Sequence, residues 1–198
     1  MSILTNIKKA IQNRSAGRQE KVSRAWFMDM LKSMKTNRKA ILGDSELVST
    51  SAVTIGSMYL YEYDAKHKDT LPYWDQFPLI ILIGVTPNGF SGLNLHYLPP
   101  VMRARFLDKL METANNKNLT DNTKMRITYD LLQGTSKYKE FAPCHKNYLF
   151  SQVRSTLKKV PAEYWETVSF LPVEKFVGES KLKVWQESRK LIYKRKKR

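Results

Sequence analysis

The sequence predicts an α+β fold, a small antiparallel sheet or partial barrel that is covered by helices. Three observations lead to this prediction. Residues 58–64 alternate strictly, with Tyr59, Tyr61 and Tyr63 on one face, as in a half-buried strand. Residues 79–85 form a continuous apolar run of strand length. Other parts of the chain place their apolar residues three and four positions apart, which is the period of a helix.

The predicted sheet is an antiparallel meander over roughly residues 55–97. The run 79–85 is rich in β-branched residues, and we expect it to be a central strand buried on both faces. The Thr-Pro-Asn-Gly sequence at 86–89 follows, and Asn-Gly favours a tight turn with positive φ. Residues 90–97 alternate again and supply the return strand. We expect residues 153–160 to rejoin the sheet as a further strand.

The predicted helices flank this sheet on both sides in the sequence. Residues 3–35 predict two amphipathic helices that are broken near Ser-Ala-Gly at 15–17. A helix over 101–115 follows two prolines, and a second short helix is expected at about 122–133. A last helix begins at Pro161 and is ended or kinked by Pro172.

Positive charge is concentrated at the two ends of the chain. The 198 residues include 34 Lys and Arg against 18 Asp and Glu, for a formal net charge of +16. Residues 1–40 hold ten basic and two acidic residues, residues 181–198 hold nine and one, and residues 41–180 hold fifteen of each. We therefore predict a basic helical arm over 1–40, a neutral α+β core domain over 41–180 and a basic C-terminal segment over 181–198. This layout is typical of a protein that binds a polyanion.

The closing five residues, 194–198, are all cations, and consecutive like charges repel unless a counter-charge is supplied. We favour the phosphate backbone of double-stranded DNA as that counter-charge over an anionic membrane surface and over a purely solubilising role. Twelve residues are predicted to contact phosphates: Lys8, Lys9, Arg14, Arg18, Lys21, Arg24, Lys190, Lys194, Arg195, Lys196, Lys197 and Arg198.

The cellular compartment follows from what the sequence lacks. A single cysteine, Cys144, excludes an intramolecular disulfide. The first residues do not have the order of a signal peptide, and the longest apolar stretch is too short to span a bilayer. We expect the protein to act in a reducing cytoplasm or in a particle assembled there, without a cofactor.

One segment suggests a metal-dependent nuclease. Asp64-Ala65-Lys66 matches a short element in which a carboxylate holds a divalent ion and a lysine positions the attacking water. His67 follows directly, but the sequence offers no convincing further carboxylate. We favour a solvated charged turn here. Phosphate-binding glycine loops and paired-cysteine metal sites do not occur in the sequence.

Three other features have a structural and a functional interpretation. His96 is expected to be a hydrogen-bonded structural residue rather than a ligand or base. Cys144-His145 could be a nucleophile and its base, but adjacent residues of a strand point to opposite faces, which disfavours this pairing. A set of aromatic residues could stack on unpaired bases, although a half-buried sheet surface is the favoured interpretation. These are Tyr59, Tyr61, Tyr63, Tyr73 and Trp74.

Several segments together resemble a protein family of contractile-tailed bacteriophages, described as DNA end protector or head completion proteins. The resemblance covers roughly residues 55–190, is carried by aromatic-proline motifs and does not extend to residues 1–40. The segments that carry it are 58–66, 71–80, 89–100, 160–166 and 169–176.

This resemblance implies a virion protein that acts late in head assembly and is not an enzyme. It would occupy the ends of packaged linear double-stranded DNA, inside the head or neck, and shield them from host exonuclease in the cytoplasm after injection. Its implied partners are DNA and head, portal or neck proteins. Two alternatives stay open: a structural head-completion or neck protein whose basic arms meet an acidic protein surface, and the nuclease centred on Asp64 and Lys66.

Overall fold

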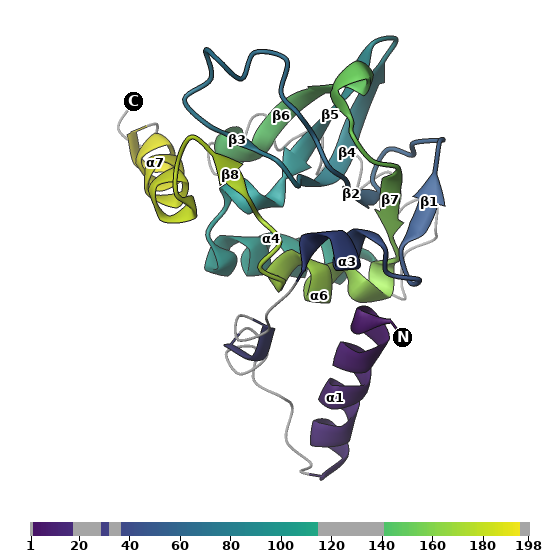
Figure 1. Ribbon diagram of the computed structural model, residues 1–198. Coiled ribbons are helices and arrows are strands. Elements are labelled where there is room, and N and C mark those ends of the chain that lie inside the picture. The colour runs from purple at the N-terminus through teal and green to yellow at the C-terminus, as the bar shows by residue number, and fades with distance from the viewer. Residues whose placement is uncertain (1, 18–28, 32–36, 115–140, 195–198) are drawn as a thin grey trace.

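The computed structural model describes residues 2–17, 29–31, 37–114 and 141–194. Within these residues helices pack against a six-stranded sheet (Figure 1), which confirms the α+β class. Neighbouring strands are antiparallel throughout this sheet, and its two outer strands do not pair with each other, so the sheet is open. Its strands, in order, are β1 (Val48–Thr50), β7 (Leu157–Val160), β2 (Met58–Leu60), β4 (Leu79–Thr86), β5 (Gly89–Asn94) and β6 (His145–Leu149).

The helices occupy three places around the sheet (Figure 1). Three of them form a layer on one face, a fourth projects away from the body, and the fifth packs at its side, next to a small second sheet. The layer holds α3 (Arg38–Leu42), α4 (Pro100–Ala114) and α6 (Trp165–Phe170), the projecting helix is α1 (Ile3–Gly17), the side helix is α7 (Lys181–Lys194), and the second sheet pairs β3 (Trp74–Asp75) with β8 (Phe176–Val177). None of the described helices combines the length and the apolar composition needed to cross a membrane.

Residues 79–83 of strand β4 are buried on both faces, as the continuous apolar sequence predicts, whereas Val85 at the end of the predicted run is 47% exposed. Ile81 and Ile83 pack into the larger core, between the sheet and the helices. Ile80 and Leu82 pack into a second cluster on the opposite face, together with the alternating tyrosines that follow β2. The alternating segment 58–64 correctly predicts the buried tyrosine face. The strand itself covers only 58–60 and is buried on both faces, so the predicted half-buried strand over 58–64 is wrong in its length and in its exposed face.

The β4–β5 hairpin forms where it is predicted, but Gly89 has a different role. Thr86 pairs with Gly89, so Pro87 and Asn88 are the loop residues. Positive φ among the described residues occurs only at Gly56 and Gly178, and the expected positive φ in this turn is wrong. A Cβ at residue 89 would lie 2.1 Å from the Tyr148 carbonyl oxygen of β6. Glycine is required because it lets two backbones approach closely.

The return strand ends earlier than its alternating sequence predicts. β5 stops at Asn94, and residues 95–97 form a 3₁₀ turn. The Asn94 Oδ1 accepts a hydrogen bond from the His96 backbone N–H at 3.0 Å, and this side-chain cap competes with continuation of the strand. The predicted strand over 95–97 is therefore wrong, although these residues are still buried.

The remaining elements follow the predictions in part. The last helix begins as a 3₁₀ turn at 162–164, continues as α6 and ends before Pro172, as expected. The expected strand at 153–160 is shorter, because only 157–160 belongs to β7. The predicted helix at about 122–133 lies outside the described residues, as does the chain directly after α1.

The basic arm is attached to the core at its first turn. The buried Asp44 carboxylate accepts hydrogen bonds from the backbone N–H groups of Ile3, at 2.6 Å, and Leu4, at 3.2 Å. These N–H groups have no partner within the helix, so a carboxylate there both caps α1 and complements its dipole. Leu4 and Ile7 then enter the larger core. The start of α1 is fixed while the rest of the helix projects outward (Figure 1).

A buried arginine of α4 connects this helix to α6, to the turn after β5 and to α7. Arg103 is only 1% exposed, and its guanidinium donates hydrogen bonds to the carbonyl oxygens of Leu98 (2.8 Å), Ser169 (2.9 Å) and His96 (3.3 Å). Glu174, also buried, lies 3.9 Å from the guanidinium, and this carboxylate also reaches Lys181 of α7 at 3.4 Å. One side chain thus links α4, α6, the turn after β5 and, through Glu174, α7.

Asp75 of β3 is a second buried polar centre. Its Oδ1 accepts from the Phe77 and Lys175 backbone N–H groups at 3.1 and 3.4 Å. Its Oδ2 contacts the Asn94 amide at 3.0 Å and His96 Nδ1 at 2.7 Å. His96 is therefore a structural residue held by a carboxylate within the core, as expected.

Replacing Arg103 with methionine should destabilise the fold severely. The variant keeps an apolar side chain of comparable length but leaves the buried Leu98 and Ser169 carbonyls without this donor and removes the buried cation beside Glu174. We expect a loss of about 3 to 5 kcal/mol in the free energy of unfolding, measured with urea. Arg105→Met, an exposed position on the same helix, is the control and should change it by less than about 0.5 kcal/mol. Equal stability of the two variants would show that the buried network does not hold the fold.

Candidate nucleic-acid interface

Only some of the twelve predicted phosphate ligands lie where the structure describes side chains. These are Lys8, Lys9 and Lys190. Arg14 and Lys194 belong to α1 and α7, whose backbone is described at these positions. The predicted ligands outside the described residues are Arg18, Lys21, Arg24, Arg195, Lys196, Lys197 and Arg198.

The described members do not form one patch. α1 and α7 leave the body at different sides (Figure 1), so the arm and the C-terminal segment present two separate groups of cations. Residue 38, at the end of the predicted arm, has a structural role: Arg38 donates to the carbonyl oxygens of Val173 and Glu174 at 2.9 and 3.1 Å. A cation used in this way is committed to the core and is not available to phosphates.

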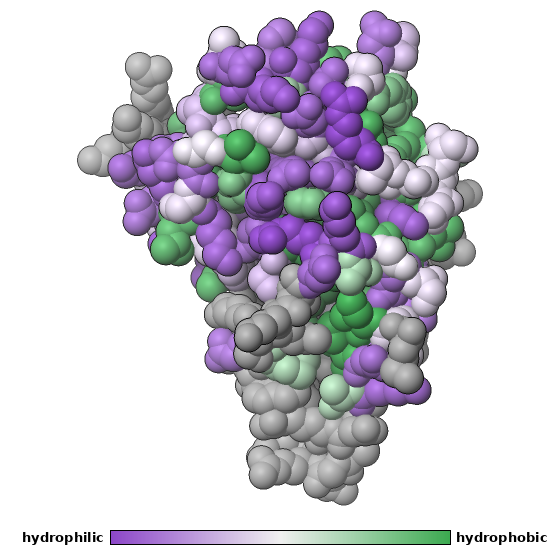
Figure 2. All heavy atoms as spheres, viewed as in Figure 1, coloured by the Kyte–Doolittle hydropathy of each residue, from purple (hydrophilic) through white to green (hydrophobic). Residues whose placement is uncertain are grey.

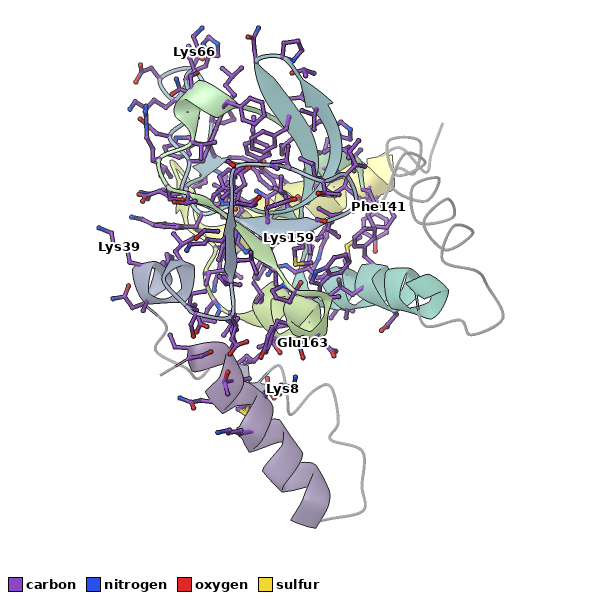
Figure 3. All side chains as sticks on the ribbon, turned by 90° about the vertical axis from the view of Figure 1, so that its right-hand side faces the viewer. Lys8, Lys39, Lys66, Phe141, Lys159 and Glu163 are labelled. Carbon is purple, nitrogen blue, oxygen red and sulfur yellow. The ribbon has the colours of Figure 1, made fainter. Side chains whose placement is uncertain are left out.

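Lys8 and Lys9 differ in their surroundings. Figure 3 shows Lys8 beside Glu163, with which it forms an ion pair and a hydrogen bond. The hydrogen bond to Glu163 raises the pKa of Lys8, and the ammonium also lies 5.3 Å from the centre of the Tyr164 ring. Lys9 is exposed and has no ion pair with the described part of the chain. Lys9 is therefore the better placed of the two for a phosphate, since Lys8 would have to leave its carboxylate.

Helix α7 turns one stripe inward and its cations outward. Val184, Ser188 and Ile192, four residues apart, are buried. Arg189 and Lys190 are exposed and form no ion pair with described residues, in contrast to Lys181 and Lys183, which pair with Glu174 and Glu179. Arg189 is not among the twelve predicted phosphate ligands, although the spacing of the apolar residues places it on the outer face of the helix.

The docking of α7 fixes the direction in which this charge is presented. Trp185 Nε1 donates to the His96 carbonyl oxygen at 2.8 Å, and the Arg103 guanidinium lies 5.4 Å from the centre of the Trp185 ring. Helix α7, which leads into the basic C-terminal residues, is thus held against the core by these two side-chain contacts.

Figure 2 shows hydrophilic residues gathered over the upper part of the face that it displays, around the strands.

Asp64 has cationic partners of its own. Its carboxylate is 3.1 Å from the Lys68 ammonium and 3.4 Å from the Arg154 guanidinium. The hydrogen bond from Lys68, followed by that from Arg154, lowers the pKa of Asp64. Within the described residues no group of three His, Cys, Asp or Glu side chains comes together as a metal site. A metal ion at Asp64 would have to displace two cations.

The Cys144 thiol is poorly suited to nucleophilic attack. Cys144 is fully buried, and burial raises the pKa of its thiol to about 12, so the thiolate is scarce at neutral pH. Its Sγ donates to the Phe141 carbonyl oxygen at 2.9 Å. The nucleophile-and-base interpretation of Cys144 and His145 therefore has no chemical support.

Most of the proposed base-stacking surface is buried. Tyr59, Tyr61 and Tyr63 are at most 7% exposed and pack against one another and against neighbouring rings, so stacking on bases is wrong for these three. Tyr73 and Trp74 are half-buried and line a cavity. The aromatic set thus divides into the core rings Tyr59 and Tyr61, the largely buried Tyr63 at the cavity wall, and the half-buried Tyr73 and Trp74 of the same wall.

A protein-family model described as "Phage T4 terminal DNA protecting protein" matches residues 2–193 of the chain. The match covers nearly the whole sequence. It includes the basic arm, to which the visible resemblance did not extend. No curated protein and no solved structure gives a significant match.

Changing Asp64 to alanine should leave DNA binding intact, because its carboxylate serves as a counter-ion to Lys68 and Arg154. The measurement is a band shift on linear duplex, with incubation of linear DNA plus magnesium or manganese in parallel. Asn88→Ala, at an exposed neutral position of the β4–β5 loop, is the control. Metal-dependent cleavage by the unchanged protein that disappears in Asp64→Ala would contradict the assignment.

Proposed function

Since the chain belongs to the family of the phage T4 terminal DNA protecting protein, we propose that it binds the ends of packaged linear double-stranded DNA without reading sequence and shields them from exonuclease. Family membership makes it a bacteriophage DNA-binding protein that protects DNA ends. The sequence-independent mode, the steric mechanism and the residues involved are our proposal. The observation that carries them is the docked helix α7, whose exposed Arg189 and Lys190 form no ion pair with described residues and whose last residue begins the run of five cations at 194–198.

Protection of this kind requires no chemistry at the DNA. An exonuclease has to grip the terminal base pairs, and a protein bound there excludes it sterically. Affinity comes from Lys and Arg, which release condensed counterions from the duplex when they contact phosphates. Phosphate contacts carry no direct sequence information, and this suits a protein whose DNA ends can have any sequence.

We propose that the protein is not an enzyme. The Asp64 carboxylate forms ion pairs with Lys68 and Arg154. The Cys144 thiol is buried and, with its raised pKa, protonated at neutral pH. Neither group is therefore arranged for catalysis. Its site of action would be the virion, at the head or neck, and the host cytoplasm after injection. Head, portal or neck proteins would be its protein partners.

One observation favours the second candidate, a head-completion or neck protein without a direct DNA role. Helix α7 exposes three large apolar side chains next to its cations, which is common where a protein partner docks. Leu182 is 63% exposed, Leu191 51% and Tyr193 65%. A band shift at moderate salt separates the two candidates, because a protein used only for packing should show no affinity for DNA.

The protein should protect linear double-stranded DNA against an end-dependent exonuclease and leave an internal endonuclease largely unhindered. The physical reason is that occupancy of an end blocks only enzymes that start there. The measurement compares the digestion of one linear DNA by the two enzymes, at a ratio of one protein per DNA end. Equal protection against both enzymes would instead indicate general coating of the duplex.

Deleting residues 194–198 should weaken DNA binding almost uniformly across sequences and reduce its salt dependence. Each neutralised phosphate contributes about 0.9 to the slope of log affinity against log salt, so loss of five contacts lowers its magnitude by roughly 4.5. The deleted residues follow Ile192, the last buried residue of α7, and the melting temperature should therefore barely move.

The matched control keeps the chain length and replaces the five cations of this tail with glutamine. It should reproduce the deletion, because charge and not length carries the effect. A folded variant with an unchanged salt slope would show that the tail serves another partner, and DNA binding would then have to rest on the N-terminal arm.

A further inference from the structure

A cavity of about 330 Å³ lies between the segment 63–75, the 3₁₀ turn 95–97 and strand β6. This volume is in the lower range of small-ligand sites and is far too small for a duplex. Lys66, at its rim, lies at the end of the molecule opposite α1 (Figure 3). The cavity is therefore separate from helix α1.

Aromatic rings form much of the cavity wall. Tyr73 and Trp74 are half-buried, and Tyr97 and Tyr148 close the interior. Every nucleobase has a π-face, so aromatic walls bind bases of any sequence by stacking. Tyr73 and Trp74 also belong to the aromatic residues that the sequence suggested for stacking on unpaired bases, and their partial exposure is compatible with that role.

The cavity also holds a cation without an acidic partner. The Lys146 ammonium lies 4.1 Å from the centre of the Tyr97 ring and forms no ion pair with the described residues. Burial lowers its pKa, since part of its hydration is lost. A partly desolvated, unpaired ammonium interacts strongly with an anion that enters the cavity.

The other charges of the cavity also favour an anion. Lys66 and His67 are exposed at the rim and have no ion pair with described residues. Asp75 is the acidic residue of the wall, but both of its oxygens accept hydrogen bonds from groups inside the core. The residues that line the cavity therefore include two lysines and one histidine against this one carboxylate, while Glu187 of α7 lies beside Tyr73.

The cavity adjoins the basic helix α7. Burial and a hydrogen bond to Glu187 of α7 raise the pKa of Tyr73, to about 12. Arg189 and Lys190 follow Glu187 on the same helix, so a duplex that contacts these two cations would pass close to the cavity. A cavity of this size admits one nucleotide that has left the base stack. Unpairing costs least at the end of a duplex, where one neighbour is missing.

We propose that this cavity binds the terminal nucleotide of the DNA, with its base against Tyr73 and Trp74 and its phosphate at Lys146 and Lys66. The inference rests on the proposed function and adds to it the feature that distinguishes an end from the interior of a duplex. Phosphate contacts along α7 and the tail give affinity for any duplex, whereas the cavity is filled only at an end.

The test measures binding of three labelled duplexes of equal length to the full chain. One has single-stranded overhangs, one has blunt ends, and one is closed by hairpin loops at both ends. We expect affinity to fall in that order. Lys146→Met should weaken binding of the overhang duplex by about tenfold, because a charge-assisted contact is lost, and leave binding of the closed duplex unchanged.

Two further variants keep the test decisive. Lys66→Ala, at the exposed rim, should cause a smaller loss that is also confined to open ends, and it carries the test if Lys146→Met does not fold. Lys39→Met removes an exposed cation of α3, far from Lys66 in Figure 3, and should not alter the preference for open ends. Melting temperatures confirm that each variant is folded.

The possible outcomes test the cavity assignment and the proposed function independently. Equal affinity of the unchanged protein for open and closed DNA overturns the cavity assignment, and so does an equal loss of affinity for both in Lys146→Met and Lys66→Ala. Exonuclease protection is measured in parallel. Its absence in the unchanged protein overturns the proposed function, whereas protection that persists in both variants overturns the cavity assignment alone.

Discussion

The buried guanidinium of Arg103 is the interaction on which the arrangement of this protein depends. A charged group inside a protein is costly unless it is paired and hydrogen-bonded. Arg103 meets this requirement only when the Leu98 and Ser169 carbonyls and Glu174 stand around it together. Leu98 is close to Arg103 in the sequence, but Ser169 and Glu174 lie in a distant segment, so satisfying one side chain specifies how α4 packs against that segment. The burial of this charge thus favours one arrangement over looser alternatives.

The same principle attaches both basic ends to a neutral body. Glu174 extends the network to Lys181, and Trp185 shares the His96 carbonyl with Arg103, so the charge centre of the core also positions α7. At the other end Asp44 holds the start of α1 through otherwise unpaired backbone N–H groups. Acidic residues of the core therefore serve as anchors. Cations beyond these anchors, such as Lys190, remain available to an external polyanion.

Periodicity was sufficient to predict the fold class but not its polar interior. The run 79–85 and the alternation at 58–64 predicted β4 and the buried tyrosines, because burial of a strand depends on local sequence. The end of β5 was missed because the Asn94 cap is a side-chain contact that does not change the alternating pattern. Arg103 and Lys146 were missed for a related reason. Nothing in the local sequence shows that a basic residue will be surrounded by carbonyls or by aromatic rings from distant segments.

Phosphate-binding cations and the cavity make different contributions to the proposed recognition of a DNA end. Phosphates are present along the whole duplex, so in the proposed mode of binding cations such as Arg189 and the terminal five would give affinity that does not distinguish an end from the interior. An end differs from the interior because its last nucleotide can leave the base stack. A cavity that holds a single unstacked nucleotide therefore binds at an end and not along the duplex. Long-range attraction through the termini and short-range selection in a cavity beside α7 are therefore complementary. Salt weakens the first strongly, whereas a partly buried contact such as that offered by Lys146 is screened much less.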